Sequence, residues 1–535
     1  DSPRIVRGEP IFGVDTQLDG MLYAAYERAP VFGARLVSAK LDAAKAVPGV
    51  EQVFVVEGGE EAEALVDGVA ILAKNWWIAN KAREQLEIEW DNGRWAAHSS
   101  ESYDRQARQL LGRKAMRSLA EDGDMDRAVA SAAKVVEADY FYPFLAHVPM
   151  EPQNCTALSH KDGTMEIWVP SQAPERGHTG VSEMLGLPPE KVRIHMTRNG
   201  GGFGRRLIND YMFQAAAIAA KVPGTPVQLI WSREDDLRSD FYRPAGWHRL
   251  RAAIDGSGRL SGVEDHFVTF GDPDKLSIAA MMSETEFPAE FVPNLRYGYS
   301  AMESRVPLGP LRAPRSNGIA YAFQSFLDEV AEAQGRDLPA LLLDLLSVSK
   351  TLPGREGPMG RQPGFNSDRA RGVIEKVVEM SGWKAGAPAG RGKGLGFYFS
   401  HLGYFAEVVE AGVSAGGEVG VHHVWVAGDV GSHIINPHGA LNQVEGSVID
   451  GIGQAIGLAV KIEGGKVAQS NFHDYPVPRM PMTPRIDVEF LRTDNPPTGL
   501  GEPALPPVIP ALVNALHAAT GKRIRSLPID GSALV

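Results

Sequence analysis

The stretch GGGFG at residues 200–204 constrains this chain more than any other feature of its sequence. Four of its five residues are glycines, and they lie between an apolar strand pattern and an apolar helix pattern within residues 193–221. Glycine loses more backbone entropy than any other residue when a chain folds. A tight surface turn without a ligand needs one or two glycines, so four of them favour a backbone that a ligand approaches closely.

The glycine loop does not match the two commonest phosphate-binding motifs. The third glycine of a dinucleotide-binding GxGxxG motif would fall at Arg205 or Leu207. No Gly-Lys-Ser/Thr follows, so the Walker pattern fails as well. What remains is a set of backbone amides at the start of a helix, followed by Arg205 and Arg206. This arrangement suits an anionic or oxo-rich ligand.

The composition limits the classes of function. With 535 residues the chain is long enough for two or three domains. Its formal net charge of −12 gives no general attraction to nucleic acid or to an anionic membrane. No apolar run reaches the roughly 20 residues that cross a bilayer. The one cysteine, Cys155, cannot supply the four thiolates of an iron–sulfur cluster, so one-electron chemistry requires a bound cofactor or another subunit.

The start of the chain carries a doubled pattern of strands and helices. We expect a helix over residues 38–47, opened by Ser38 as N-cap and closed by Pro48 and Gly49. Residues 92–109 are polar and are predicted to be a flexible stretch, which places a domain boundary near residue 130. Strands are predicted at 21–30, 50–57, 68–73 and 86–91, with a second helix at 75–85.

The rest of the chain alternates strands with helices, without a further convincing linker. This pattern predicts an α/β or α+β architecture and leaves the topology open. The last helix is expected to follow prolines and to end at Gly521. Further strands are predicted at 164–170, 191–197, 226–232, 248–255 and 420–427, and further helices at 321–335, 338–347 and 510–521.

A second constrained loop, GPLRAPRSN at residues 309–317, holds Arg312 and Arg315 just ahead of a predicted helix. Proline and glycine restrict its backbone on both sides of the arginines. In the simplest interpretation both arginines are solvated. The alternative is that they belong to the same binding site as the glycine loop.

A third loop holds Glu502 behind Gly499 and Gly501. Four prolines follow within the next eight residues, so the segment after the carboxylate is stiff and apolar. Glu502 has two structural interpretations, a surface carboxylate or a partner of a helix dipole. The functional interpretation is a general base. A carboxylate held rigidly at the mouth of an apolar segment suits a base, provided that the fold buries it.

Taken together, these stretches resemble the molybdenum hydroxylases, the family of xanthine dehydrogenase and aldehyde oxidase, and most closely the large subunit of the isoquinoline 1-oxidoreductase type. Each motif alone is weakly specific, but six of them occur in the family's order. Residues 8–33 with 46–56 look like the family's αβ-hammerhead domain. The six motifs are FLAHVPMEPQNCTA (144–157), GGGFGRR (200–206), REDDLRSDFYRP (233–244), GPLRAPRSN (309–317), NPHGALNQVEGSVIDGIGQAIG (436–457) and GEPALPPVIPALVNALHAATGKRIRSLPI (501–529).

The resemblance implies a role for each matching residue. In the family the glycine loop passes its backbone close to the molybdenum of a molybdopterin cofactor, often the cytosine dinucleotide form in bacterial members. Water supplies the oxygen, and no side chain is expected to bind the metal directly. The residues implied for cofactor binding are Gly201, Gly202, Phe203, Gly204, Arg205 and Gln443, and those implied for catalysis are Glu502 as the base and Arg312 near the metal.

Three departures from the family pattern narrow the expectation. Leu207 stands where purine-oxidising members often carry Glu, and Leu145 stands where the family often has a Gln near the metal, so purine is not the expected substrate. The family's Gly-Gln-Gly-x-x-Thr cofactor segment is not recognisable, and GIGQAIG at 451–457 is a different element. We expect either a further chain that carries this segment or a longer polypeptide of which this is the C-terminal part.

The resemblance also implies partners and a location. Because one cysteine cannot hold a cluster, [2Fe–2S] centres are expected on a partner subunit, with a cytochrome or other acceptor beyond it. Isoquinoline-type relatives are often exported to the bacterial periplasm, although this sequence shows no signal and a cytoplasmic location stays open.

We therefore predict an α+β chain with a hammerhead-like domain at 1–130 and a molybdopterin-binding domain in two halves, 131–345 and 346–535. Its predicted function is hydroxylation of an aldehyde or an N-heteroaromatic carbon. The alternatives are a molybdenum-free relative that acts as a hydrolase, and a structural or binding subunit. The absence of a His-Glu-x-x-His motif speaks against the commonest zinc hydrolases.

Overall fold

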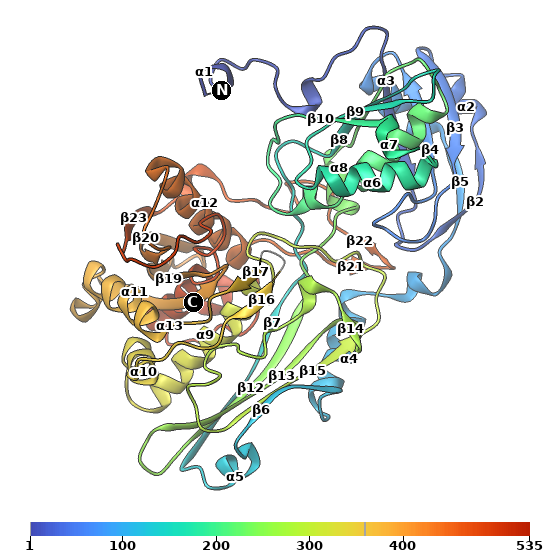
Figure 1. Ribbon diagram of the computed structural model, residues 1–535. Coiled ribbons are helices and arrows are strands. Elements are labelled where there is room, and N and C mark those ends of the chain that lie inside the picture. Colours follow the sequence, from blue (N-terminus) through green and yellow to red (C-terminus); the bar gives the residue numbers. More distant parts are fainter. Residues whose placement is uncertain (1, 358–359) are drawn as a thin grey trace.

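A seven-stranded mixed sheet joins the start of the chain to residues 154–230 (Figure 1). The computed structural model describes residues 2–357 and 360–535. Strand β1 pairs in parallel with β11, with Leu22 opposite Val227. The sheet therefore spans the boundary expected at residue 130, and the division into domains stays a prediction. In spatial order its strands are β10 (Val192–Met196), β9 (Met165–Val169), β8 (Asn154–Ser159), β11 (Val227–Ile230), β1 (Leu22–Arg28), β4 (Gly68–Ala73) and β3 (Val50–Val56).

Helices and a small two-stranded sheet cover this first lobe. Helix α7 (Asp210–Ala220) packs on β8 and β11, and nine of its residues are buried. Strands β2 (Arg35–Lys40) and β5 (Glu87–Asp91) form an antiparallel pair. The other helices of the lobe are α1 (Ser2–Ile5), α2 (Asp42–Lys45), α3 (Trp76–Ala82), α6 (Pro174–Leu185) and α8 (Arg233–Arg238).

Two local predictions in this lobe are wrong. Ser38 lies in β2 with its hydroxyl on Glu89, and α2 is only Asp42–Lys45 with no side-chain cap. The pairing of β2 with β5 outweighs the helical propensity of residues 38–41. The predicted flexible stretch contains helix α4 (Ser100–Leu111), capped by Ser99. Its apolar face is buried against the six-stranded sheet described in the next paragraph. This burial stabilises a helix of mostly polar residues.

The second sheet is long and strongly curved, and it runs below the first lobe in Figure 1. Its strands β12 and β13 form the central antiparallel pair, and helix α9 (Ser316–Ala333) packs on β12 and β7. The strands are β6 (Arg117–Asp122), β15 (Leu295–Met302), β13 (Leu260–Asp272), β12 (Gly246–Ile254) and β7 (Lys134–Tyr142), with β14 (Lys275–Leu276) paired to β13. Helices α5 (Met125–Ala130) and α10 (Leu338–Leu345) belong to the same part of the chain.

A four-stranded sheet forms the centre of the C-terminal lobe, with helices on both sides. Helix α13 packs on β18 and β19, and α11 packs on β19 and β20. As predicted, α13 ends at Gly521, which adopts the left-handed conformation at φ +73°. The elements are β18 (Arg391–Ser400), β19 (Gly403–Val413), β20 (Val419–Asp429), β23 (Arg485–Phe490), α11 (Ser367–Met380), α12 (Pro437–Ile456) and α13 (Val508–Thr520), with the short pairs β16 (Arg355–Gly357)–β17 (Gly360–Gln362) and β21 (Ile462–Glu463)–β22 (Lys466–Val467).

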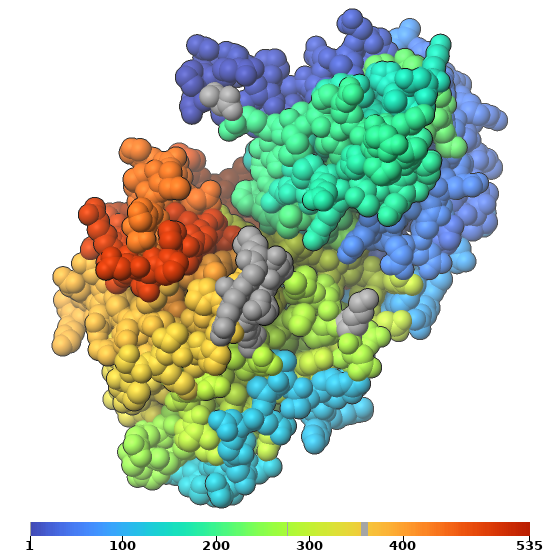
Figure 2. All heavy atoms as spheres, in the orientation of Figure 1, coloured from blue at the N-terminus to red at the C-terminus, as the bar shows by residue number. Residues whose placement is uncertain are grey.

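The largest hydrophobic core continues from the second sheet into the C-terminal lobe, whereas the first lobe has cores of its own. The predicted α+β class is confirmed. Figure 2 shows the surface hollowed between the first lobe and the C-terminal lobe. Within residues 2–357 and 360–535, no helix combines the length and apolar character that crossing a membrane requires.

Candidate functional site

The glycines of the 200–204 loop are required by the protein packed against it. A Cβ on Gly204 would lie 1.6 Å from the carbonyl oxygen of Pro310, and one on Gly202 would lie 2.5 Å from Oε1 of Gln172. Gly201 and Gly204 also have φ of +98° and +110°, where other residues are strained. On this side of the loop, the group that approaches the glycine backbone closely is the protein's own chain and not a ligand.

The other side of the loop offers free hydrogen-bond donors. Across the described parts of the chain, the amides of Gly201, Gly202 and Phe203 donate to no protein group. Phe203 is exposed and has φ +56° between the two left-handed glycines. Successive amides in such a backbone shape form a concave anion-binding nest. Helix α7, however, begins only at Asp210, after a short 3₁₀ turn at Arg205–Leu207, so the predicted helix start is not part of the nest.

A buried carboxylate, Glu151, holds the loop from below. Its Oε2 accepts the Gly200 amide at 2.7 Å and lies 3.1 Å from Nη2 of Arg206. Its Oε1 accepts the Val14 amide at 3.1 Å and Nδ2 of Asn154 at 2.9 Å. Glu151 belongs to the MEPQN part of a family motif, so the sequence contained a signal that could have identified it.

The side chain of Arg205 does not reach the site. Its guanidinium is fully buried and pairs with Asp210 at 2.9 Å and with Asp240 at 3.0 Å. Two carboxylates therefore neutralise the charge that the sequence interpretation assigned to an anionic cofactor. We correct that expectation for the Arg205 side chain, because a buried and doubly paired guanidinium has no free face for a ligand.

Arg312 connects three segments of the chain at the mouth of the glycine loop. Its amide donates to the carbonyl of Phe203 at 2.9 Å. Its Nε donates to the carbonyl of Gly501 at 3.0 Å, and its Nη2 donates to Oε1 of Gln443 at 3.0 Å. Burial lowers the pKa of Arg312, and Asp450 opposes this effect. The residue thus fixes the glycine loop, α12 and the 499–503 loop relative to one another.

Glu502 lies beside Arg312, with both carboxylate oxygens engaged. Oε1 accepts the amide of Ala313 at 3.0 Å, and Oε2 lies 3.2 Å from Nε2 of His401. The Glu502 side chain is 38% exposed, so it is reachable from solvent. The segment after it, from Pro503 onward, is buried as its prolines predicted. A Cβ on Gly501 would meet Gln443 only at 3.7 Å, so the protein alone does not require glycine there.

A cavity of about 830 Å³ opens beside Glu502. Its polar lining includes Glu502, His401 and Arg315, together with three further carboxylates, Glu284, Glu286 and Glu290. Most ligand pockets combine an apolar wall with a few polar groups in this way. The aromatic residues of its wall are Phe287, Phe365, Phe397, Tyr398 and Phe399.

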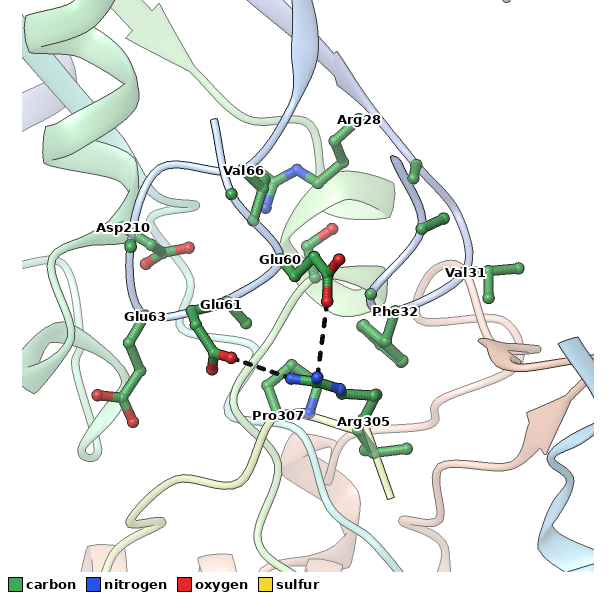
Figure 3. A pocket seen from close by; sticks show the side chains of 18 of the residues that line it. Arg28, Val31, Phe32, Glu60, Glu61, Glu63, Val66, Asp210, Arg305 and Pro307 are labelled. Carbon is green, nitrogen blue, oxygen red and sulfur yellow. Dashed lines mark hydrogen bonds and ion pairs between the residues drawn. The ribbon is translucent and has the colours of Figure 1, made fainter. Parts of the chain in front are cut away.

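A second cavity, of about 600 Å³, lies between the first lobe and the loop at Arg305 (Figure 3). Its labelled acidic groups include Glu60 and Glu61, which lie 3.6 and 3.1 Å from the Arg305 guanidinium. Its lining does not contain Glu502, which lines the other cavity. The ion pairs of Arg305 with Glu60 and Glu61 are typical of a solvated cleft. We therefore place the functional site at the cavity beside Glu502.

The structure thus brings together Gly201–Gly204, Arg312, Gln443 and Glu502, which lie in four separate stretches of sequence, and leaves the Arg205 side chain outside. Sequence reasoning missed His401, Tyr398 and Glu286. Tyr398 and Glu286 come from a strand and a loop without a motif, and His401 occupies a hairpin turn. No periodicity or spacing marks them, because their relation to Glu502 arises only from folding.

Comparison with known proteins identifies the domains of this chain. Two models of a molybdopterin cofactor-binding domain match residues 111–341 and 371–484, which together form most of the chain. The chain is 29% identical to a membrane-bound aldehyde dehydrogenase [pyrroloquinoline-quinone] of Gluconacetobacter polyoxogenes, over 99% of this chain and 70% of that protein. It is also 29% identical to isoquinoline 1-oxidoreductase subunit beta of Brevundimonas diminuta, over 99% of this chain and 67% of that protein.

A solved structure shares the fold. Quinoline 2-oxidoreductase from Pseudomonas putida 86 superimposes with a TM-score of 0.81 over 99% of this chain and 96% of that chain, at 16% sequence identity. In the present chain, Arg312 joins the glycine loop to the segment that carries Glu502. Together with the domain models that match on both sides of residue 350, this identifies the chain as a large, molybdopterin-binding subunit of the molybdenum hydroxylase family of oxidoreductases.

Proposed function

We propose that this chain hydroxylates an aldehyde or an N-heteroaromatic carbon, with Glu502 as the base. One observation carries the proposal: Arg312 bonds both to Phe203, in the loop with the free amides, and to Gly501, the residue before Glu502. The next residue, Ala313, bonds to Glu502 itself. The aromatic wall of the adjoining cavity favours a flat aromatic substrate, because ring faces and edges pack well against one another. The family members named above act on aldehydes and isoquinoline.

The residues present fit a molybdopterin cofactor. Three adjacent amides without a protein acceptor suit oxo, sulfur or phosphate groups, and Gln443 is exposed with its Oε1 already held by Arg312. When bound, the cofactor supplies the molybdenum centre that accepts two electrons from the substrate. We propose that Gly201, Gly202, Phe203, Gly204 and Gln443 hold it, and that its cytosine dinucleotide form is the one used.

In the proposed mechanism each residue of the chain has a separate task. The Glu502 carboxylate removes a proton from the water-derived oxygen that enters the product. The Ala313 amide and His401 hold its two oxygens, so it is already oriented when substrate arrives. Arg312 positions the loops that carry these groups, since its Nε and Nη2 both bond protein carbonyls. The aromatic wall excludes water from the substrate.

Metal analysis and one substitution test the proposal. We expect one molybdenum and one pterin per assembly, and neither in a molybdenum-free hydrolase or binding subunit. Glu502→Gln keeps the shape of the side chain but removes the base, so turnover should fall by at least ~10²-fold with molybdenum retained. The matched control is Glu445→Gln, an exposed carboxylate on α12. Full activity in Glu502→Gln would place the base elsewhere, and loss of the metal would make Glu502 a structural residue.

Partners and location form part of the same proposal. Electrons leave through a subunit with [2Fe–2S] centres, because Cys155 is buried in the first-lobe core and cannot hold a cluster. A further chain or segment supplies the missing Gly-Gln-Gly element, and a cytochrome or other acceptor follows. We place the assembly in the bacterial periplasm. Native mass spectrometry of a periplasmic extract should show this chain with at least one iron-containing partner, and iron bound to this chain alone would contradict the proposal.

A further inference from the structure

The hairpin turn that presents His401 has a strained backbone. Strands β18 and β19 are joined by a two-residue turn, with Ser400 paired to Gly403. The two central residues, His401 and Leu402, have φ of +50° and +66°. Turns with two left-handed residues strongly prefer Asn and Gly, and bulky residues in them are outliers. Strained residues of this kind concentrate at functional sites.

The turn places the His401 imidazole between Glu502 and Ser400. Its Nε2 is 3.2 Å from Oε2 of Glu502, and its Nδ1 is 2.7 Å from Oγ of Ser400. Partial burial lowers the pKa of His401, while Glu502 opposes this effect and Arg315 adds to it. The lowered pKa favours the neutral ring, in which one nitrogen accepts a proton and the other donates one.

Three hydroxyl groups continue from His401 through the protein; we call Ser400, Ser316 and Tyr398 the hydroxyl line. Ser400 donates to Oγ of Ser316 at 3.0 Å. Ser316, Tyr398 and Glu286 line the same cavity, and the Tyr398 hydroxyl interacts with both the Ser316 hydroxyl and the Glu286 carboxylate. The donation from Ser400 to Ser316 runs away from His401, towards Tyr398 and Glu286.

Glu286, at the end of the hydroxyl line, is well suited to receive a proton. The residue is 8% exposed and belongs to the lining of the same cavity as Glu502. Burial raises its pKa to about 7; Tyr398 and Arg315 oppose this rise, and Asp265 adds to it. Both protonation states are therefore populated at neutral pH.

We propose that His401 and the hydroxyl line carry the proton taken up by Glu502 to Glu286. The proposal rests on the proposed function, in which Glu502 is the base. Oε2 of Glu502 gives its proton to Nε2 of His401 as Nδ1 gives its own to the hydroxyl line. Each hydroxyl receives one proton and passes one on, and the last reaches Glu286. One proton leaves Glu502, one arrives on Glu286, and every group between them ends neutral, with the imidazole tautomer reversed.

Two variants cut the hydroxyl line without touching Glu502. Tyr398→Phe removes the last hydroxyl, and Ser400→Ala removes the first. In the whole assembly, each should slow reduction of the enzyme by substrate about 10-fold, and imidazole buffer should restore the rate, because a small base can take the proton directly. The matched control is Tyr297→Phe, which removes a buried hydroxyl that bonds the Glu286 backbone carbonyl and lies outside the line.

Infrared spectroscopy gives a readout that does not depend on rate. The protonated-carboxyl band that disappears in Glu286→Gln should grow when substrate reduces the wild-type enzyme, and it should not grow in either line variant. Wild-type rates with a growing band in both line variants would overturn the relay. That result, together with an inactive Glu502→Gln, leaves the proposed function standing. An active Glu502→Gln overturns the proposed function itself.

Discussion

Two buried carboxylates, one in each outer lobe, have opposite surroundings. Glu151, below the glycine loop, accepts hydrogen bonds from Gly200, Val14 and Asn154 and pairs with Arg206. Glu407, on the central strand β19 of the C-terminal lobe, is fully buried. Among the residues that the structure describes, no donor reaches either of its oxygens.

The difference shows what each carboxylate does for the fold. A buried charge costs several kcal/mol unless partners compensate it, and Glu151 has a full set. It fixes a loop that carries the free amides of the site. Burial alone raises the pKa of Glu407 well above its ordinary value, so this side chain is held neutral among apolar residues. Glu502 lies between these extremes, with two partners and access to solvent.

The largest effect is expected from breaking the Glu151 cluster. Glu151→Ala leaves the fully buried guanidinium of Arg206 without its carboxylate, and unpairing a buried ion of this kind costs about 3–5 kcal/mol. The free energy of unfolding, from urea denaturation followed by tryptophan fluorescence, should fall by this amount. Hydrogen exchange at residues 200–206 should become faster. Wild-type stability would show that the carbonyls around Arg206 compensate its charge alone.

An intermediate effect, visible as a pH dependence, is expected at Glu407. Its pKa is higher in the folded state than in the unfolded chain, so the folded state holds the proton more tightly. Stability is therefore complete below the ordinary pKa of 4.5 and falls as pH rises above it, by up to about 1.4 kcal/mol per pH unit. Glu407→Gln should remove this fall. Urea midpoints at acidic and neutral pH measure it for both proteins, and parallel curves would contradict it.

The smallest effect on stability is expected from removing the half-exposed Ser99 hydroxyl that caps α4. The Ser99 hydroxyl accepts the Ser102 amide at 3.1 Å and caps α4, the helix that replaces the predicted flexible stretch. Ser99→Ala should cost about 1 kcal/mol. The cost should appear as faster proteolysis within residues 92–112, with Ser131→Ala as the control at the C-terminal end of a helix. Unchanged proteolysis would mean that packing alone holds α4.

Much of the fold could be predicted because the pattern was local. The strands at β1, β4, β9 and β12 follow short apolar runs or apolar alternation, and α13 follows its prolines and Gly521. The error at Ser38 had a non-local cause, since β2 exists only because β5 lies beside it. A window of sequence does not contain such a partner.

The candidate site divides in the same way. The glycine loop, Arg312, Gln443 and Glu502 could be selected from the sequence because each lies in a distinctive motif, and the hydrogen bonds of Arg312 and Ala313 bring their segments together. Arg205 was selected by the same reasoning, yet its guanidinium forms ion pairs with Asp210 and Asp240. Residue type and spacing do not reveal which side of a loop a side chain takes.

By itself the sequence determined the α+β class, the family, and the residue types that meet at the site, because these depend on local patterns and motifs. Only the tertiary structure decided that Glu502 faces the cavity, that buried partners neutralise Arg205, and that His401 and Glu286 line the same cavity as Glu502. Contacts between segments a hundred or more residues apart are created by packing, and packing sets the burial, the charge partners and therefore the chemistry of each group.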